Sequence, residues 1–313
     1  MQIVFIHRGR SWYLPYALYQ AKAASPGSDI ILLGDGFTGE GIQVHSLQNL
    51  QTPNIQKFKK HYIHMSSNTV EFESFCWLKY FYLLEYMRKN QVKFVLYLDS
   101  DVLLYSSIEE IKKAYPETFW SSGCGVSMPK QDFESFTWCA SGHISYWTYE
   151  LLEEFCEFIL NSFIDNKYLG LYRGKFNWHL AKKKPGGICD MTTIYLFWNE
   201  NKDRVQNMLI NHNGNVFDDN INTATNYYKN EFVFDSGTKK VKFIDGHPHF
   251  LSADGTNTSV RAHALHFQGV GKKYMPDLYT GRPLRGITSN NILSALRAIK
   301  RIARNRLNRY FGI

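Results

Sequence analysis

The chain has 313 residues, of which 44% are hydrophobic and 20% charged, so it can bury a large core as one big α/β domain or two smaller ones. Apolar runs stay well short of the roughly 18 residues that a membrane span requires, so we expect no spanning segment. The five cysteines form no C-x-x-C pair, and no signal peptide precedes the first strand. We therefore expect reduced, mostly buried thiols in a cytoplasmic protein.

Strands and helices alternate through the first third of the chain. The pattern predicts a strand at the start of each of three segments, residues 1–10, 29–41 and 92–101. Helices are predicted between them, at 11–25 and 70–90. The strands are continuously apolar, which is typical of strands buried on both faces. The fold class predicted is therefore α/β, with a mixed, mostly parallel sheet flanked by helices.

The pattern is weaker after Tyr105. We expect a strand within 120–129 and helices at 145–163 and 189–201. The segment 261–283 is predicted to start with a strand and to continue as a loop with glycines and lysines. No internal repeat or low-complexity linker divides this part. The chain is predicted to be one catalytic domain at 1–286, followed by a C-terminal segment at 287–313.

Polar side chains follow three of the predicted strands. They are His7, Arg8, Asp35, Asp99 and Asp101. Because ligands of such sheets bind beyond the carboxyl ends of the strands, this convergence predicts a binding site at that edge.

Asp99 and Asp101 form a D-x-D motif directly after a buried strand. Two carboxylates so close repel each other unless a cation lies between them, so the motif suits a divalent metal. Solvated turn residues are the plain alternative. A phosphohydrolase of the haloacid-dehalogenase type is another, with Asp218 and Asp219 as its later acidic pair. Leu103, however, stands where that pattern has Thr or Val, and two βα units precede the motif.

A second motif, HFQGVGK, lies late in the chain and contains His266, Gly269 and Lys272. Together with D-x-D, in this order and at this separation, it resembles the metal-dependent GT-A glycosyltransferases, especially the glycogenin- and galactosyltransferase-like enzymes of family 8. Their pattern continues with Pro-Trp where this chain has Lys273 and Tyr274.

The resemblance implies a GT-A fold, a UDP-sugar donor, and Mn²⁺ (or Mg²⁺) held by Asp99, Asp101 and His266. A mixed oxygen and nitrogen ligand set suits Mn²⁺ better than an all-oxygen set does. The metal and Lys272 would neutralise the departing diphosphate. Gly269 and Gly271 would let backbone N–H groups approach its oxygens.

Further residues are assigned to the donor and acceptor by their positions. His7, Arg8 and Asp35 are placed to receive base and ribose, Ser100 lies within the D-x-D motif, and Lys79 stands where similar proteins often carry an arginine facing the nucleotide-sugar. Asp190 is expected beside the sugar and acceptor, as a hydrogen-bonding residue or general base, with a helix N-cap as the alternative. On the acceptor side we expect His143, and Trp138 and Trp147 as stacking platforms, although buried packing is the more common fate of such tryptophans.

The predicted activity is transfer of a sugar from a UDP-sugar to a saccharide or lipid-linked acceptor, with retention of configuration. The alternatives are the phosphohydrolase and a non-catalytic sugar- or lipid-binding relative. No nucleic-acid partner is expected.

Six of the charges behind the formal net charge of +8 lie in the last segment, between Ser289 and Ile313, where no acidic residue occurs. They are Arg297, Lys300, Arg301, Arg304, Arg306 and Arg309. Their helical spacing against apolar residues predicts a basic amphipathic helix, which is typical of an anchor on the anionic inner face of a membrane. Docking on the protein's own surface is the main alternative, and nucleic-acid binding is a weaker one.

Overall fold

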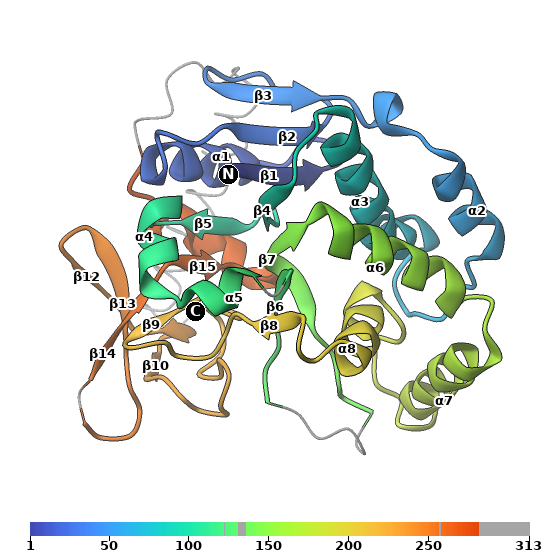
Figure 1. Ribbon diagram of the computed structural model, residues 1–313. Helices are drawn as coiled ribbons and strands as arrows, with labels where there is room; N and C mark the ends of the chain where they lie inside the picture. Colours follow the sequence, from blue (N-terminus) through green and yellow to red (C-terminus); the bar gives the residue numbers. More distant parts are fainter. Residues whose placement is uncertain (122, 131–135, 257, 282–313) are drawn as a thin grey trace, which may run out of the picture.

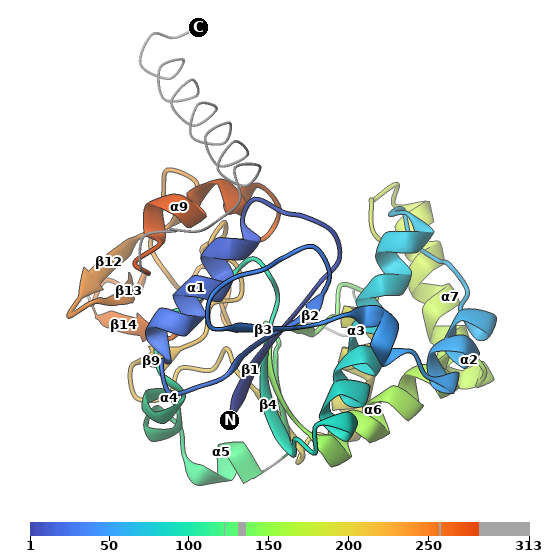
Figure 2. The same ribbon diagram turned by 90° about the horizontal axis from the view of Figure 1, so that it is seen from above.

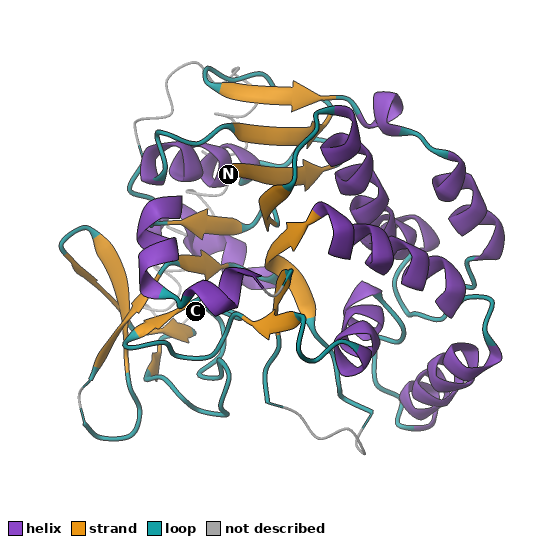
Figure 3. Cartoon of the chain, in the orientation of Figure 1, coloured by secondary structure: helices purple, strands orange, loops and turns teal. Residues whose placement is uncertain are grey.

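The computed structural model describes residues 1–121, 123–130, 136–256 and 258–281 (Figures 1 and 3). The amphipathic helix predicted at 287–313 lies outside the described residues. Within them, no helix is long and apolar enough to cross a membrane.

A mixed sheet forms the centre of the molecule (Figure 1), and its described strands follow the order β3-β2-β1-β4-β7-β6-β8. They are β1 (Gln2–His7), β2 (Ile30–Gly34), β3 (Ile42–His45), β4 (Phe94–Leu98), β6 (Cys124–Ser127), β7 (Ser141–Thr148) and β8 (Val205–Asn207). Strand β7 runs antiparallel to both neighbours, β4 and β6, and the other pairs in the sheet are parallel. The predicted α/β class with a mostly parallel sheet is confirmed.

Helices cover both faces of this sheet, as Figure 2 shows with α1 on one side and α3 and α6 on the other. The described helices are α1 (Leu14–Ala24), α2 (Pro53–His61), α3 (Val70–Lys89), α4 (Ile108–Ala114), α5 (Glu117–Ser121), α6 (Tyr149–Ser162), α7 (Asn166–Ala181), α8 (Asp190–Glu200) and α9 (Met275–Leu278). The sequence of β1 is continuously apolar because both faces of this strand are buried. Val4 packs into the core under α3 and α6, whereas Phe5 packs into the core beside α1.

The helix predicted at 145–163 is wrong at its beginning. Residues up to Thr148 belong to β7, and α6 begins at Tyr149. The Thr148 hydroxyl accepts a hydrogen bond from the Leu151 amide (3.3 Å) and caps the helix. Aromatic and β-branched side chains at this junction fill the middle of the sheet, which overrides their helical spacing. Helices α2 and α7 were not predicted.

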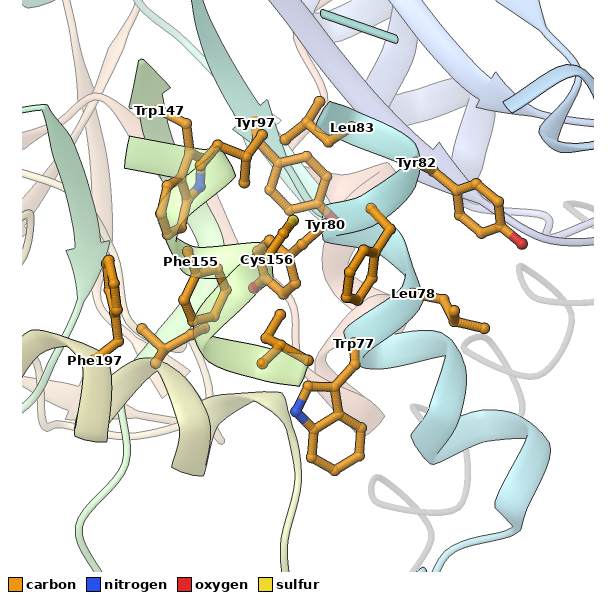
Figure 4. Close-up of a cluster of buried hydrophobic side chains, with 14 of the residues drawn as sticks. Trp77, Leu78, Tyr80, Tyr82, Leu83, Tyr97, Trp147, Phe155, Cys156 and Phe197 are labelled. Atoms are coloured by element: carbon orange, nitrogen blue, oxygen red, sulfur yellow. The ribbon is translucent and has the colours of Figure 1, made fainter. Parts of the chain in front are cut away.

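Aromatic residues make up 16% of the chain. Many of them lie in the core between the sheet and α3, α6 and α8 (Figure 4). The Trp147 and Phe155 rings stack with centroids 5.2 Å apart, and Tyr80 meets Phe155 edge-on at 5.0 Å. Trp138 and Trp147 are both fully buried. Buried packing, the more common fate of such tryptophans, is therefore confirmed, and they are not sugar-stacking platforms.

Two smaller sheets and a hairpin extend the molecule beyond the central sheet. Strand β15 (Ala264–His266) pairs with β5 (Val102–Leu104), and a second sheet has the order β12-β13-β14-β9. Its strands are β12 (Val241–Ile244), β13 (His247–Leu251), β14 (Ser259–Ala262) and β9 (Asn215–Val216), and the hairpin is β10 (Phe234–Asp235) with β11 (Thr238–Lys239). The 3-10 helices are η1 (Leu47–Leu50) and η3 (Gly269–Tyr274).

Candidate functional site

The D-x-D motif occupies the tight turn between β4 and β5. The Asp99 amide donates to the His143 carbonyl of the neighbouring strand β7 (2.8 Å), and the Val102 amide donates to the Asp99 carbonyl (3.1 Å). These bonds close the turn at the carboxyl end of β4. Both carboxylates therefore lie at the edge of the sheet where ligands of this fold class bind.

The pairing of β15 with β5 brings the second motif to the first. His266 lies opposite Val102, and the Phe267 amide donates to the Asp101 carbonyl (2.9 Å). Lys272 follows in η3, and its Nζ lies 2.5 Å from Asp101 Oδ2. His266 Nε2 lies 3.7 Å from the other oxygen of Asp101. The structure thus gathers a carboxylate, an imidazole and an ammonium group from two distant parts of the chain.

Asp99 faces a different cation, Lys79 on α3. Lys79 Nζ lies 3.5 Å from Asp99 Oδ1 and 3.1 Å from Asp190 Oδ2, and the side chains of Lys79 and Asp190 are only 10% and 8% exposed. The Tyr97 hydroxyl also donates to Asp99. Lys79 is therefore a buried residue of the site and not a surface lysine.

The pKa values of this cluster follow from its charges. Burial alone would raise the pKa of Asp99, but Lys79 and the Tyr97 hydroxyl outweigh it and hold that pKa below its usual range. Burial alone would lower the pKa of Lys79, but Asp190 and Asp99 hold it well above its ordinary value. Lys79 thus supplies a fixed positive charge to the site.

Asp190 is the first residue of α8, and Cys189 is the N-cap. Its carboxylate turns inward to Lys79 and accepts a hydrogen bond from the Tyr80 hydroxyl (3.3 Å). The N-cap alternative for Asp190 is therefore wrong, although the carboxylate does lie in the first turn, where the helix dipole favours negative charge. Asp190 and Asp99 are joined through one lysine.

His143 lies behind His266 rather than at an acceptor surface. The two rings stack with centroids 3.9 Å apart and planes 18° from parallel, and His143 is only 2% exposed. Burial first, and then the neighbouring His266, hold the pKa of His143 well below its ordinary value. The predicted direct contact of His143 with an acceptor is therefore wrong.

The residues assigned to the nucleotide lie along the same edge. His7 Nδ1 is 2.9 Å from Ser100 Oγ, so the end of β1 contacts the centre of the D-x-D motif. Gly34 lies opposite His7 in β2, which places the exposed Asp35 just beyond it. Arg8 is exposed as well, and its guanidinium lies 5.1 Å from the Phe75 ring centroid.

The two glycines of the second motif have different structural roles. Gly269 has φ +55°, a conformation that few other residues adopt easily. Gly271 packs against Asn222, whose Nδ2 would lie 2.6 Å from an added Cβ. The Gly271 amide already donates to the Gln268 carbonyl (2.9 Å), so the glycine serves the turn that carries Lys272.

A divalent metal fits the Asp101 and His266 side of this site. His266 Nδ1 lies 2.6 Å from the Asp219 carbonyl, which can only accept, so in the neutral ring Nδ1 carries the hydrogen and Nε2 a lone pair. That lone pair and the Asp101 carboxylate face each other at 3.7 Å, an arrangement that a cation stabilises. Across the described ranges, no group of three or more His, Cys, Asp or Glu side chains encloses a metal position. At this site the third predicted ligand, Asp99, is turned to Lys79.

The acidic pair of the phosphohydrolase alternative has another role. Asp218 Oδ1 binds Lys239 Nζ (2.6 Å), and Asp218 Oδ2 accepts the His266 amide (3.1 Å). Both side chains of the Asp218–Lys239 pair are fully buried. Burial raises the pKa of Asp219 to about 6, with Lys239 opposing it. Because both Asp218 oxygens are engaged, the geometry gives that alternative no support.

Comparison with known proteins yields structural matches. No protein-family model and no curated protein matches the chain. Mouse xyloside xylosyltransferase 1 in its apo form matches with 10% identity and a TM-score of 0.47, over 68% of this chain and 86% of the other. The galactosyltransferase LgtC, with donor and acceptor sugar analogues, matches with 16% identity and a TM-score of 0.46, over 91% and 98%. The bifunctional glycosyltransferase WbbM matches with 10% identity and a TM-score of 0.45, over 89% and 48%. All three are named as glycosyltransferases.

Replacing Lys79 by methionine should strongly destabilise the protein near neutral pH. The substitution leaves two carboxylates without their shared cation, and breaking a buried ion pair in this way costs about 3–5 kcal/mol of unfolding free energy. In the wild type, Asp99, with its lowered pKa, contributes stability above its ordinary value of 3.8. Lys79, with its raised pKa, contributes below its ordinary value of 10.5. Without the lysine, Asp99 should be easier to protonate, so the loss should be smaller at pH 5 than at pH 7.5.

Urea unfolding of wild type and Lys79→Met at both pH values measures this loss. Lys167→Met is the control, since Lys167 pairs with Glu200 on the surface, where its side chain is 64% exposed, and its removal should change little. Equal stabilities of Lys79→Met and Lys167→Met would show that the buried triad does not hold the site together.

Proposed function

We propose that the protein is a Mn²⁺-dependent glycosyltransferase that moves a sugar from a UDP-sugar to a saccharide or lipid-linked acceptor with retention of configuration. The observation that carries the proposal is the pairing of β15 with β5, which puts His266 and Lys272 against Asp101. A carboxylate, an imidazole and a lysine at a strand end are the groups that a metal-bound diphosphate requires.

Cleavage of the donor's sugar–phosphate bond leaves negative charge on the diphosphate. A divalent metal held by Asp101 and His266, with Asp99 in the same turn, would supply Lewis acidity and positive charge at that point. Lys272 is the chain's own cation there. Its ammonium lies between the Asp101 carboxylate and the Tyr13 ring, 5.2 Å from the ring centroid, and is only partly exposed. From this position it would bind an oxygen of the departing diphosphate and stabilise its growing charge.

The sugar would lie on the side of Asp190 and Lys79. The Asp190 carboxylate is held by Lys79 and the Tyr80 hydroxyl, so its position is fixed before the donor binds. A carboxylate fixed in this way can accept hydrogen bonds from sugar hydroxyls and orient the ring. In a retaining reaction we assign Asp190 this orienting role rather than that of a general base.

The nucleotide would extend along the carboxyl ends of β1 and β2. His7 contacts Ser100, and burial, opposed by the nearby aspartates, lowers the pKa of His7. The ring is therefore neutral near pH 7 and suited to hydrogen bonding. Arg8 and Asp35 are exposed beyond it and would contact the ribose and base.

Asp101→Asn should abolish the Mn²⁺ dependence of UDP binding. The substitution removes a carboxylate ligand and leaves the shape of the side chain nearly unchanged. Calorimetric titration of UDP with and without Mn²⁺ tests this, with donor hydrolysis across several nucleotide-sugars as a second measurement. If wild-type protein binds UDP equally well without a divalent metal, or if Asp101→Asn retains the wild-type response, the proposed metal-dependent site is wrong.

Lys272→Met should lower kcat for donor hydrolysis by about 10²–10³-fold and change donor binding much less, because the ammonium acts on charge that develops during bond cleavage. Lys273→Met is a matched control. That lysine is the next residue of η3, and its ammonium lies over the Tyr274 ring, 4.7 Å from the centroid. Steady-state kinetics of both variants should separate them, and equal kcat values would remove Lys272 from the mechanism.

We also propose that residues 287–313 anchor the enzyme to anionic membranes on the cytoplasmic side, on the basis of their six basic residues. Deletion of residues 289–313 should abolish binding to phosphatidylglycerol vesicles and leave donor hydrolysis nearly unchanged. Binding by the full chain should weaken as salt rises, since each cation contributes about 1 kcal/mol near such a surface. Vesicle sedimentation at low and high salt measures this. A truncated protein that still sediments, or that unfolds, would show that the segment belongs to the domain's own packing.

A further inference from the structure

We propose that the buried Asp218–Lys239 pair is the positioning device of the active site, which holds His266 so that only its Nε2 is presented to Asp101. The inference concerns the site to which the proposed function assigns a metal, and rests on that function for its catalytic meaning. The geometry stands by itself. Neither residue belongs to the D-x-D or HFxGxxK motif.

The backbone of His266 is fixed on both sides by one short segment. The His266 amide donates to Asp218 Oδ2 (3.1 Å), and the His266 carbonyl accepts the Ile221 amide (2.9 Å). On its other edge, β15 pairs with β5. His266 is thus held between β5, which follows the D-x-D turn, and residues 218–221. It cannot shift unless the hydrogen bonds on one of these two sides are broken.

The ring of His266 is fixed by the same segment. Its Nδ1 donates to the Asp219 carbonyl (2.6 Å), and its face stacks on His143. His143 is fixed in turn, since its Nε2 donates to the Asp218 carbonyl (3.2 Å) and its Nδ1 accepts from the Ser141 hydroxyl (2.8 Å). His266 thus carries its hydrogen on Nδ1 and His143 carries its hydrogen on Nε2. The free nitrogen of His266, Nε2, is therefore directed at Asp101, 3.7 Å away.

Lys239 holds this segment in place from the hairpin formed by β10 and β11. Its Nζ donates to Asp218 Oδ1 (2.6 Å) and to the Asn220 carbonyl (2.7 Å), and its own amide donates to the Ile221 carbonyl (2.8 Å). Lys239 thus binds three residues of the one segment, 218–221, that holds His266. Asp218 and Lys239 are both 0% exposed.

Such a pair is a costly way to gain stability. Apolar residues of similar volume often stabilise a fold as well as a buried ion pair does, because they avoid the desolvation of two charges. What an ion pair adds is geometric definition, since charged hydrogen bonds are short and directional. Here that definition is applied to the imidazole whose Nε2 faces Asp101.

The decisive variant is the double replacement Asp218→Asn with Lys239→Met. Both single variants leave a buried charge or donor unpaired and are expected to unfold at lower temperature. The double variant removes both charges, and an asparagine amide oxygen can still accept the His266 amide. Its melting temperature should therefore recover toward that of the wild type, while the ring of His266 becomes less well fixed.

Two measurements then separate positioning from stability. Nitrogen-15 NMR of the histidine rings in the metal-free protein should show one His266 tautomer, protonated at Nδ1, in the wild type and averaged signals in the double variant. Binding of Mn²⁺ in the presence of UDP, followed by electron paramagnetic resonance, should weaken about 10- to 100-fold, as expected for loss of a group that orients a metal ligand.

Arg261→Met is the matched control. Arg261 pairs with Glu110 at 2.7 Å, in a polar cluster on β14 and α4 that does not contact His266. The control should lower the melting temperature without changing the His266 signals or Mn²⁺ binding.

Unchanged His266 ring signals in the double variant would overturn the inference, as would the same change in Arg261→Met. Altered ring signals together with no Mn²⁺ binding by the wild type would support the positioning role and contradict the proposed metal-dependent function. The two proposals therefore fail in different ways.

Discussion

The candidate site depends on a short antiparallel pairing, that of β15 with β5. Only three residue pairs join the strands, from Ala264 opposite Leu104 to His266 opposite Val102. All six side chains are buried, five of them hydrophobic. Apolar packing thus fixes the register, and the register in turn fixes His266 beside Asp101. A slip by one residue would turn His266 to the other face of the pair and separate the two motifs.

The reversed direction of β7 completes the site. In a parallel sheet each strand contributes only the residues that follow its carboxyl end. Because β7 is antiparallel to β4, it contributes the residues at its beginning, and His143 comes to lie opposite Asp99. Its carbonyl closes the D-x-D turn, while its ring supports His266 from behind. One residue at the start of a reversed strand therefore contacts both motifs.

The sequence predicted the parallel units and the two motifs, since apolar periodicity and short motifs are local properties. It did not predict which direction each side chain takes. The resemblance implies that Lys79 faces the nucleotide-sugar, whereas the fold turns it inward between Asp99 and Asp190. The sequence marks Asp218 only as half of an acidic pair. Its partner Lys239 comes from a hairpin whose placement depends on tertiary contacts, and no local pattern identifies it. The last residues of β7, from Ser145 to Thr148, are predicted as helix because their aromatic side chains also satisfy helical spacing.

The charges of the site are divided into two groups before any ligand binds. Lys79, whose side chain is 10% exposed, neutralises the buried Asp190 and the partly exposed Asp99, whereas Lys272, whose side chain is 25% exposed, neutralises Asp101. The buried Lys79 is held by two carboxylates, so we expect it to stay in place when a ligand binds. The more exposed lysine is held by one, so a ligand that brings negative charge can compete for it. The diphosphate of the proposed donor would be such a ligand, and Lys272 would then be free to bind it.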